Sequence, residues 1–384
     1  MNLIYLDNAS TTQVDPRVVE TMIPYFLEKY ANSSSNHLFG TSINNDVKVS
    51  RNKIAEIINS ENNEVIFTSG ATEAINLSIK GVASNYSNKG KHIVTVQTEH
   101  SAVLDVCKYL ETNGGYDITY LPVDEHGIIN LDQLKHALRQ DTILVSVMYV
   151  NNETGVIQPI KEISEITHNN NSIFMTDATQ AFGKIPIDVN DLGVDLMSFS
   201  GHKIYGPKGI GVLYCRNRGK NKVKIHPLIH GGGHERGLRS GTSNVPGIIG
   251  LSKAAEIAVQ EIEIDKERIN RLRDILENEL LKIDNSFING HKEKRIYNIT
   301  NICFRGVDAD AVITGLKNIA VSNGSACTST SLTPSHVLKA LGKSDDDAYS
   351  SIRFSLGKFN NETEIKRTIA AITIVINELK GLIS

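Results

Sequence analysis

The sequence of 384 residues has no hydrophobic run long enough to cross a membrane; among the longest is residues 143–150, which Ser146 interrupts. It has no run rich in Lys and Arg, and its formal net charge is −3, which argues against a nucleic-acid-binding surface. Residues 1–7 hold neither a basic segment nor a long apolar one, and residues 381–384 hold no cysteine for a lipid anchor. We therefore expect a cytoplasmic protein that binds neither membranes nor nucleic acid.

Cysteine is also scarce. The four cysteines are Cys107, Cys215, Cys303 and Cys327, and none is spaced from another as in a CxxC metal or redox pair. Free thiols in a reducing compartment are expected, with at most one of them reactive. Three histidines spaced by four, at positions 226, 230 and 234, lie in a glycine-rich segment without a defined helix, so we expect no metal site there.

Strand-like and helix-like segments alternate over residues 65–199, which is typical of an α/β fold with a mostly parallel sheet covered by helices on both faces. The predicted strands are residues 65–67, 93–96, 118–121, 143–150, 173–176 and 196–199. Asp15 and Pro16 predict the start of a helix that runs through Val18, Met22, Tyr25 and Phe26. Near Pro246 the pattern changes to a long amphipathic helix over about residues 248–281, with a break, and then to a smaller α+β unit.

The segment 195–211 places one lysine, Lys203, just after a predicted buried strand and before a turn rich in glycine. Burial disfavours the charged form of a lysine, and the free amine can then attack an aldehyde to form a Schiff base. A solvated lysine in a surface turn is the alternative interpretation.

Other polar segments also follow predicted strands. Residues 68–73 open a helix, where backbone N–H groups and the helix dipole suit a phosphate, although a simple helix N-cap is the alternative. Residues 98–101, 150–155 and 176–180 follow further strands, and ligands of open α/β sheets bind beyond such ends. Asp177 there needs a cationic partner, such as a protonated pyridine nitrogen, unless it only caps a helix.

These motifs together resemble the cysteine desulfurases, which are pyridoxal-phosphate enzymes of the aspartate aminotransferase fold type in the class V aminotransferase group. The resemblance runs from residues 5–9 to residues 352–357, and its motifs are residues 69–73, His100, 152–153, 177–180, 200–203 and 325–327. It implies the pyridoxal-phosphate-dependent transferase fold type I, with a mostly parallel sheet of seven strands. A large cofactor-binding domain is predicted over residues 15–250, and a small domain over residues 1–14 and 251–384 that carries the cysteine loop.

The resemblance also implies residue roles. Lys203 would form the Schiff base, Asp177 would pair with the pyridine nitrogen, and His100 would stack on the ring and take part in proton transfer. Further residues implied to contact the cofactor are Gln180 at the ring oxygen, Asn152, and, at the phosphate, Ala71, Thr72, Ser200, His202 and Thr242, the last from a neighbouring subunit. Asn152 and Arg353 would bind the substrate carboxylate, which the guanidinium fork suits.

Cys327, in a stretch of small polar residues, would be the nucleophile that takes sulfur from L-cysteine and leaves alanine and an enzyme persulfide. Cys107 and Cys303 fit structural positions. Residues 231–242 resemble the family's inter-subunit loop and predict a homodimer. Residues 32–36 depart from an Asn-Pro-Ser-Ser motif common in relatives. The sulfur-acceptor protein could therefore belong to iron–sulfur assembly or to tRNA or DNA thio-modification.

Other functions share part of this pattern. An aminotransferase or a kynureninase-like hydrolase would share Lys203 and Asp177 but would not need Cys327. A cofactor-binding regulator would normally add a DNA-binding module, and the sequence has no segment of that kind. Selenocysteine lyase activity is the nearest alternative to cysteine desulfuration.

Overall fold

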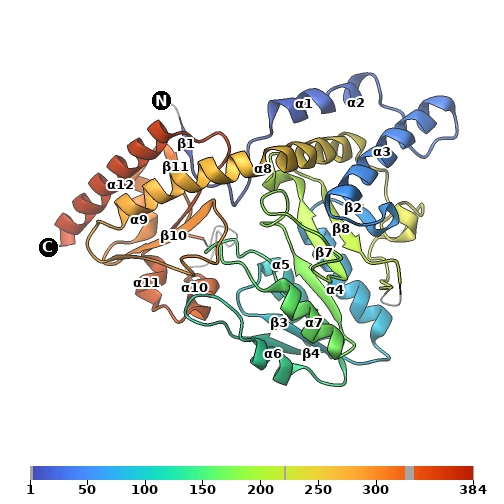
Figure 1. Cartoon of the computed structure of the whole chain (residues 1–384), viewed down its shortest axis with the longest axis horizontal. Coiled ribbons are helices and arrows are strands. Elements are labelled where there is room, and N and C mark those ends of the chain that lie inside the picture. The colour runs from blue at the N-terminus through green and yellow to red at the C-terminus, as the bar shows by residue number, and fades with distance from the viewer. Residues whose placement is uncertain (1–2, 220–221, 325–332, 384) are drawn as a thin grey trace.

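The computed structural model describes residues 3–219, 222–324 and 333–383 (Figure 1). Its main sheet has seven strands in the order β2-β8-β7-β6-β5-β3-β4. The strands are β2 (Val65–Thr68), β3 (His92–Val96), β4 (Asp117–Leu121), β5 (Thr142–Ser146), β6 (Ile173–Asp177), β7 (Leu196–Ser200) and β8 (Gly211–Cys215). Only β8 runs antiparallel to its neighbours, so the predicted mostly parallel sheet is confirmed.

Two hydrophobic cores lie on opposite faces of this sheet, because successive residues of a strand point to opposite sides. Leu196 belongs to the core under α4 (Ala71–Tyr86) and α5 (Ser101–Gly114). Met197 belongs to the other core, which contains buried residues of the helices on that face. These helices are α3 (Leu38–Ile57), α6 (Leu131–Ala137), α7 (Ile160–Asn169) and the first half of α8 (Val245–Leu280). The central strands β5 and β7 are buried at every position because both faces of the sheet are covered.

Helix α8 is continuous over 36 residues, so the predicted break in this helix is wrong. Asn244 caps its start through the N–H of Gly247, and Pro246 occupies the first turn, where its missing N–H is not needed. Ile248 of its first half packs into a core of the large sheet, and Leu276 of its second half packs into a third core. The helix therefore continues from one core to the other (Figure 1).

The third core lies in the smaller part of the molecule. Its sheet has the order β12-β10-β9, formed by β9 (Ser286–Ile288), β10 (Ile299–Phe304) and β12 (Ser351–Ser355). The N-terminal strand β1 (Ile4–Tyr5) pairs with β11 (Ile319–Ala320). The helices are α9 (Ala309–Gly315), α10 (His336–Ala340), α11 (Asp345–Tyr349) and α12 (Glu362–Ile383). The α+β class is as expected, whereas the domain boundaries at residues 15 and 251 stay a prediction.

Two local expectations need correction. The predicted strand 143–150 is assigned only as far as Ser146, although the N–H groups of Val147 and Tyr149 still donate to the Met175 and Asp177 carbonyls of β6. The helix that begins after the Asp15 cap ends at Met22 as α1 (Pro16–Met22), and α2 (Pro24–Leu27) starts separately at Pro24. Proline has no N–H for helix continuation.

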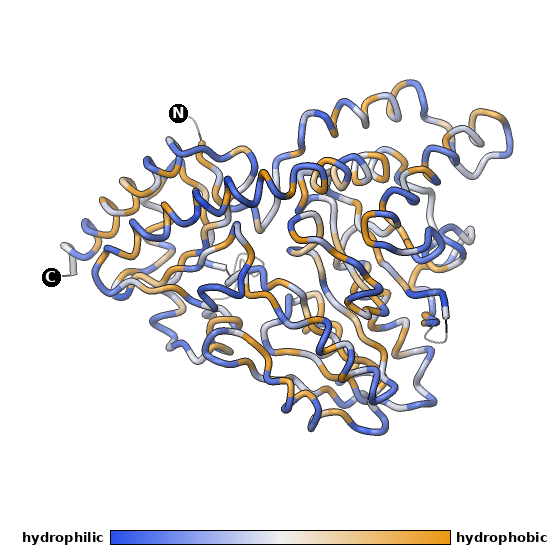
Figure 2. The backbone as a smooth tube through the Cα atoms, viewed as in Figure 1, coloured by the Kyte–Doolittle hydropathy of each residue, from blue (hydrophilic) through white to orange (hydrophobic). Residues whose placement is uncertain are grey.

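Polar and apolar residues alternate along the outer helices. Figure 2 shows blue and orange alternating along α8 and α12, as expected for helices with one buried side. Within the described part of the chain, no helix combines the length and apolarity of a membrane span.

Candidate active site

A cleft of about 630 Å³ lies beyond the carboxyl ends of β6 and β7. Loops after several strands line it, which is the position expected for a ligand of an open α/β sheet. The predicted site residues that line it are Ala71, Thr72, His100, Asn152, Asp177, Gln180, Ser200, His202, Lys203 and Arg353. Ten residues chosen from separate motifs are thus brought together around one cleft.

Lys203 ends a short 3-10 helix, η2 (Gly201–Lys203), directly after β7. Its Nζ donates to the carbonyl oxygens of Ala9 and Ser10, each at 2.6 Å. The side chain is half-buried and faces the cleft, so the alternative of a solvated lysine in a surface turn does not hold. The N-terminal segment thus holds the amine at the wall of the cleft.

One end of the cleft is suited to an anion. Helix α4 begins there, and its N-cap residue is Gly70, which makes no side-chain capping bond. Gly211 of β8 lies so close that a Cβ on it would sit 2.6 Å from the Gly70 Cα, which fixes the helix start against the sheet. Uncapped N–H groups of Ala71 and Thr72 at a helix N-terminus favour a phosphate. Gly70 is the N-cap of α4, so residues 68–73 begin the helix as the alternative required, and the phosphate site stays a prediction.

His202 borders the same end of the cleft. Its Nδ1 lies 3.1 Å from the Thr11 hydroxyl. Burial, followed by the charges of Lys203 and Lys208, lowers the pKa of His202 to about 4. The ring is neutral at neutral pH and can donate one hydrogen bond without adding a charge.

Asp177 is the last residue of β6 and is buried. Its Oδ1 accepts hydrogen bonds from the Thr179 N–H at 2.9 Å and from the Thr179 hydroxyl. These hydrogen bonds form the local turn expected if Asp177 only caps the segment that follows it. The residue also lines the cleft, so holding the turn and facing a ligand are compatible.

His100 is the N-cap of α5 and lines the cleft opposite the strand ends. Its Nδ1 accepts from the backbone N–H of Ala102 at 3.1 Å. Burial lowers the pKa of His100, so the ring is neutral at neutral pH. Because Nδ1 must accept from an amide, the ring hydrogen lies on Nε2.

Arg353 lies in β12 and is almost completely buried. Its Nη1 donates to the Asn152 carbonyl at 2.9 Å, and its Nη2 donates to Asp7 and to the Ser10 hydroxyl, each at 2.7 Å. Its Nε has no hydrogen-bond partner among the described residues. A buried donor without a partner is unusual in a folded protein, and the Arg353 residue lines the cleft, where its positive charge suits a carboxylate ligand.

Two predicted site residues are not brought to the cleft by the described chain. Thr242 is exposed and does not line it; the prediction placed this residue in the site of a neighbouring subunit. Cys327 lies outside the described residues, although Gly324, three positions earlier, lines the cleft. Both roles stay predictions.

The three described cysteines are buried. Burial raises the pKa of Cys107, Cys215 and Cys303 to about 12 in each case. Thiols in such surroundings do not form thiolates at neutral pH, as expected for structural positions.

The histidines at 226, 230 and 234 form no candidate metal centre. Among the residues that the structure describes, no three His, Cys, Asp or Glu side chains gather in a way that would hold a metal ion. His226 instead lies 2.8 Å from the Ser84 hydroxyl on α4.

Several residues at the site were not assigned from the sequence. Asp7 and Ser10 bind Arg353, and Lys184 binds Gln180 at 2.9 Å. Residues 5–9 already belonged to the matching pattern, but no local signal links them to a strand almost 350 positions away. Lys184 could have been suspected only from its apolar neighbours at 182 and 185.

The residues around the cleft fit pyridoxal phosphate. The anion site at α4, the amine of Lys203 and the carboxylate of Asp177 face one space, and each matches a different part of that molecule. Arg353 adds a positive charge at the cleft, beyond the groups assigned to the cofactor.

Comparisons with known proteins agree with this chemistry. The family model of class V aminotransferases matches residues 4–368. The cysteine desulfurase IscS of Pectobacterium carotovorum is 50% identical over 382 residues, which cover 99% of this chain and 94% of that protein. A solved NifS-like protein superimposes with a TM-score of 0.91 at 38% identity, covering 98% and 99% of the two chains. A structure of SspA in complex with cysteine gives a TM-score of 0.81 at 37% identity, with coverage of 93% and 100%. The chain therefore belongs to the class V aminotransferases, within the cysteine desulfurase family.

Proposed function

We propose that this protein is a cysteine desulfurase that uses pyridoxal phosphate to transfer the sulfur of L-cysteine to Cys327. The observation that carries the proposal is the cleft itself, where the Lys203 amine, the N-terminus of α4 and the Arg353 side chain meet. Membership in the cysteine desulfurase family and the cysteine-bound relative SspA support the choice of substrate.

When bound, pyridoxal phosphate supplies an aldehyde and an electron-accepting ring. Lys203 provides the amine that bonds the aldehyde, and its amine is already held at the cleft wall by two carbonyl oxygens. Asp177 would pair with the pyridine nitrogen, and His100, which also lines the cleft, would stack on the ring and take part in proton transfer. The residues assigned to the phosphate are Ala71, Thr72, Ser200 and His202, with Thr242 of a second copy.

Arg353 orients the substrate through its carboxylate. The guanidinium is held on one side by Asp7 and Ser10, and the residue lines the cleft, where its positive charge attracts a carboxylate. Asn152 lines the cleft and fixes Nη1 through its backbone carbonyl, so its side-chain amide can contribute a second contact. A planar fork of this kind matches a carboxylate in position and charge.

The sulfur step balances without an external oxidant. The Cys327 thiolate attacks the substrate sulfur, the carbon–sulfur bond breaks, and that carbon takes a proton to complete alanine. Cys327 is left as a persulfide, which a sulfur acceptor can then take. Cys107, Cys215 and Cys303 cannot replace it, because burial raises the pKa of each thiol to about 12.

The Cys327→Ser variant tests this assignment. We expect it to keep the fold, the cofactor absorbance and the spectral response to L-cysteine, but to lose alanine production. Cys107→Ala is the matched control and should remain active. Mass spectrometry of wild-type protein after L-cysteine and alkylation should locate the persulfide on the peptide that contains Cys327. Full turnover by Cys327→Ser, or a persulfide on another cysteine, would contradict the mechanism.

A homodimer is part of the proposal. Large apolar side chains are exposed around α2 and the start of α3, including Leu27 at 71% and Leu38 at 91% exposed surface. Such an apolar region on a chain is typical of a protein–protein interface. Sedimentation at micromolar concentration should show a dimer; a fully active monomer would refute it. The cytoplasmic location and the identity of the sulfur-acceptor protein, for iron–sulfur assembly or thio-modification, remain predictions.

A further inference from the structure

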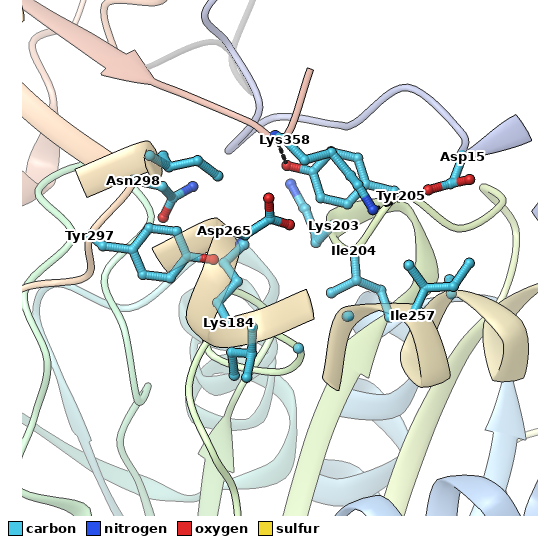
Figure 3. A pocket seen from close by; sticks show the side chains of 15 residues that line it. Asp15, Lys184, Lys203, Ile204, Tyr205, Ile257, Asp265, Tyr297, Asn298 and Lys358 are labelled. Atoms are coloured by element: carbon cyan, nitrogen blue, oxygen red, sulfur yellow. Dashed lines mark hydrogen bonds and ion pairs between the residues drawn. The ribbon is translucent and has the colours of Figure 1, made fainter. Parts of the chain in front are cut away.

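Lys184 lies behind the cleft, in a position where lysine is rare. It follows Gly183, whose φ of +72° permits a tight turn and where a Cβ would sit 2.8 Å from the Ile204 side chain. Lys184 is only 5% exposed. It lines a closed space of about 20 Å³ together with Lys203, with room for about one water molecule (Figure 3).

The ammonium of Lys184 has no carboxylate partner within the described chain. Asp265 lines the same small cavity (Figure 3) but pairs with Arg268 at 3.2 Å. Burial, and then the charge of Lys203, lowers the pKa of Lys184 to about 7. A buried amine without a counter-ion costs stability, so its presence calls for a compensating role.

The contacts of Lys184 point to that role. Its Nζ donates to the Gln180 Oε1 at 2.9 Å and more weakly to the Gln180 carbonyl at 3.3 Å. On the other side, the Gln180 Nε2 donates to the Ala9 carbonyl at 2.8 Å. An ammonium can only donate and a carbonyl can only accept, so both neighbours require the same orientation of the amide.

That orientation leaves one N–H of Gln180 available. The amide nitrogen carries two hydrogens, of which one is used by Ala9, and Gln180 lines the cleft. The carbonyl of Ala9 also accepts from Lys203 at 2.6 Å. Lys184, Gln180, Ala9 and Lys203 therefore form one connected hydrogen-bond chain from the buried cavity to the reactive amine.

We propose that Lys184 is a positioning residue, which fixes the Gln180 amide so that its N–H group, and not its oxygen, faces the cofactor's ring oxygen. The inference rests on the proposed function, because Gln180 is assigned to that oxygen by family resemblance. Without Lys184, only the Ala9 carbonyl still holds the amide in this orientation, and an amide turned the other way would point its oxygen at the negatively charged ring oxygen.

A spectroscopic titration tests the inference. A donor to the ring oxygen stabilises the anionic form, so its loss raises the pH midpoint at which the absorbance of the lysine-bound cofactor changes. We expect Lys184→Met to raise this midpoint by about one pH unit, a tenfold change in proton affinity. Gln180→Leu should raise it similarly. The double variant should match either single variant, because the two residues act through one hydrogen bond.

The double variant distinguishes positioning from a direct effect of charge. Lys184→Met shifts the pH midpoint by some amount in the wild-type protein. The proposal is supported if the same substitution shifts it by less than half of that amount in the Gln180→Leu protein. A larger shift, or no shift from Lys184→Met alone, overturns it. Lys184→Leu repeats the test if the Met variant folds poorly. The titration requires no L-cysteine, so absence of alanine production by wild-type protein would defeat the proposed function and leave this inference standing.

Discussion

Arg295 and Arg353 are both buried arginines paired with an acid, but their hydrogen bonding differs. Arg295 makes a two-pronged pair with Glu277, at 2.6 and 2.7 Å, and its Nε donates to the Lys292 carbonyl. Arg353 uses only Nη2 for Asp7, and its Nε has no partner among the described residues. Each guanidinium nitrogen of Arg295 has a partner, whereas Arg353 keeps a buried Nε that has none among the described residues.

The difference indicates which arginine serves structure and which serves a ligand. An unsatisfied buried donor costs about 1–3 kcal/mol, so a fold without a use for it tends to close the fork, as Arg295 does. Burial alone does not separate the two residues, since their side chains are 5% and 3% exposed. Substitutions at the two positions should therefore affect different measurements.

The largest effect is expected from Arg353→Lys. Lysine keeps the charge but cannot present the planar fork to Asp7 and a substrate carboxylate together. We expect kcat/KM for L-cysteine to fall about a thousandfold, equivalent to about 4 kcal/mol. Steady-state alanine production measures this, with urea unfolding as a check on the fold. Arg295→Lys is the control; an equal loss of kcat/KM there would remove the distinction between the two arginines.

Arg295→Met should affect stability instead. It leaves the Glu277 carboxylate buried without its partner, which costs about 3 kcal/mol in the free energy of unfolding. Urea unfolding measures the loss. The kcat/KM of the folded protein should stay near wild type, because Arg295 does not line the cleft. A large fall in kcat/KM without a stability change would contradict this assignment.

The sequence was sufficient for features encoded locally. The buried strand before Lys203 and the helix start at residues 68–73 both depend on neighbouring residues, and the sequence predicts both at the positions where the structure has them. The partners of Arg353 could not be predicted, because Asp7 and Ser10 meet it only after β1 packs into the third core. The continuity of α8 could not be predicted either, because its polar middle section resembles a helix break.

A smaller effect is expected when both members of the closed pair are replaced. Arg295→Met combined with Glu277→Leu removes the buried charge together with its partner. We expect stability within about 1 kcal/mol of wild type, since a well-packed apolar pair often replaces a buried ion pair at little cost. The comparison of the single and double variants by urea unfolding isolates the coupling. A double variant less stable than Arg295→Met would show that the charges themselves are needed.

The last effect concerns pH, because the expected difference in stability shrinks as the pH falls. Burial raises the pKa of Glu277, but hydrogen bonds from Arg295 and Thr300 outweigh it and hold the pKa below its ordinary value of 4.5. Because the pKa of this acid is lower in the folded state, the unfolded chain binds the proton first as the pH falls. The stabilisation present above pH 4.5 is therefore lost as the pH drops through the folded-state pKa. Glu277→Gln should therefore cost about 2 kcal/mol at pH 7 and progressively less below pH 4.5. Urea unfolding of both proteins at a series of pH values measures the gap; a gap that stayed constant into strong acid would mean that Glu277 acts through packing and not through its charge.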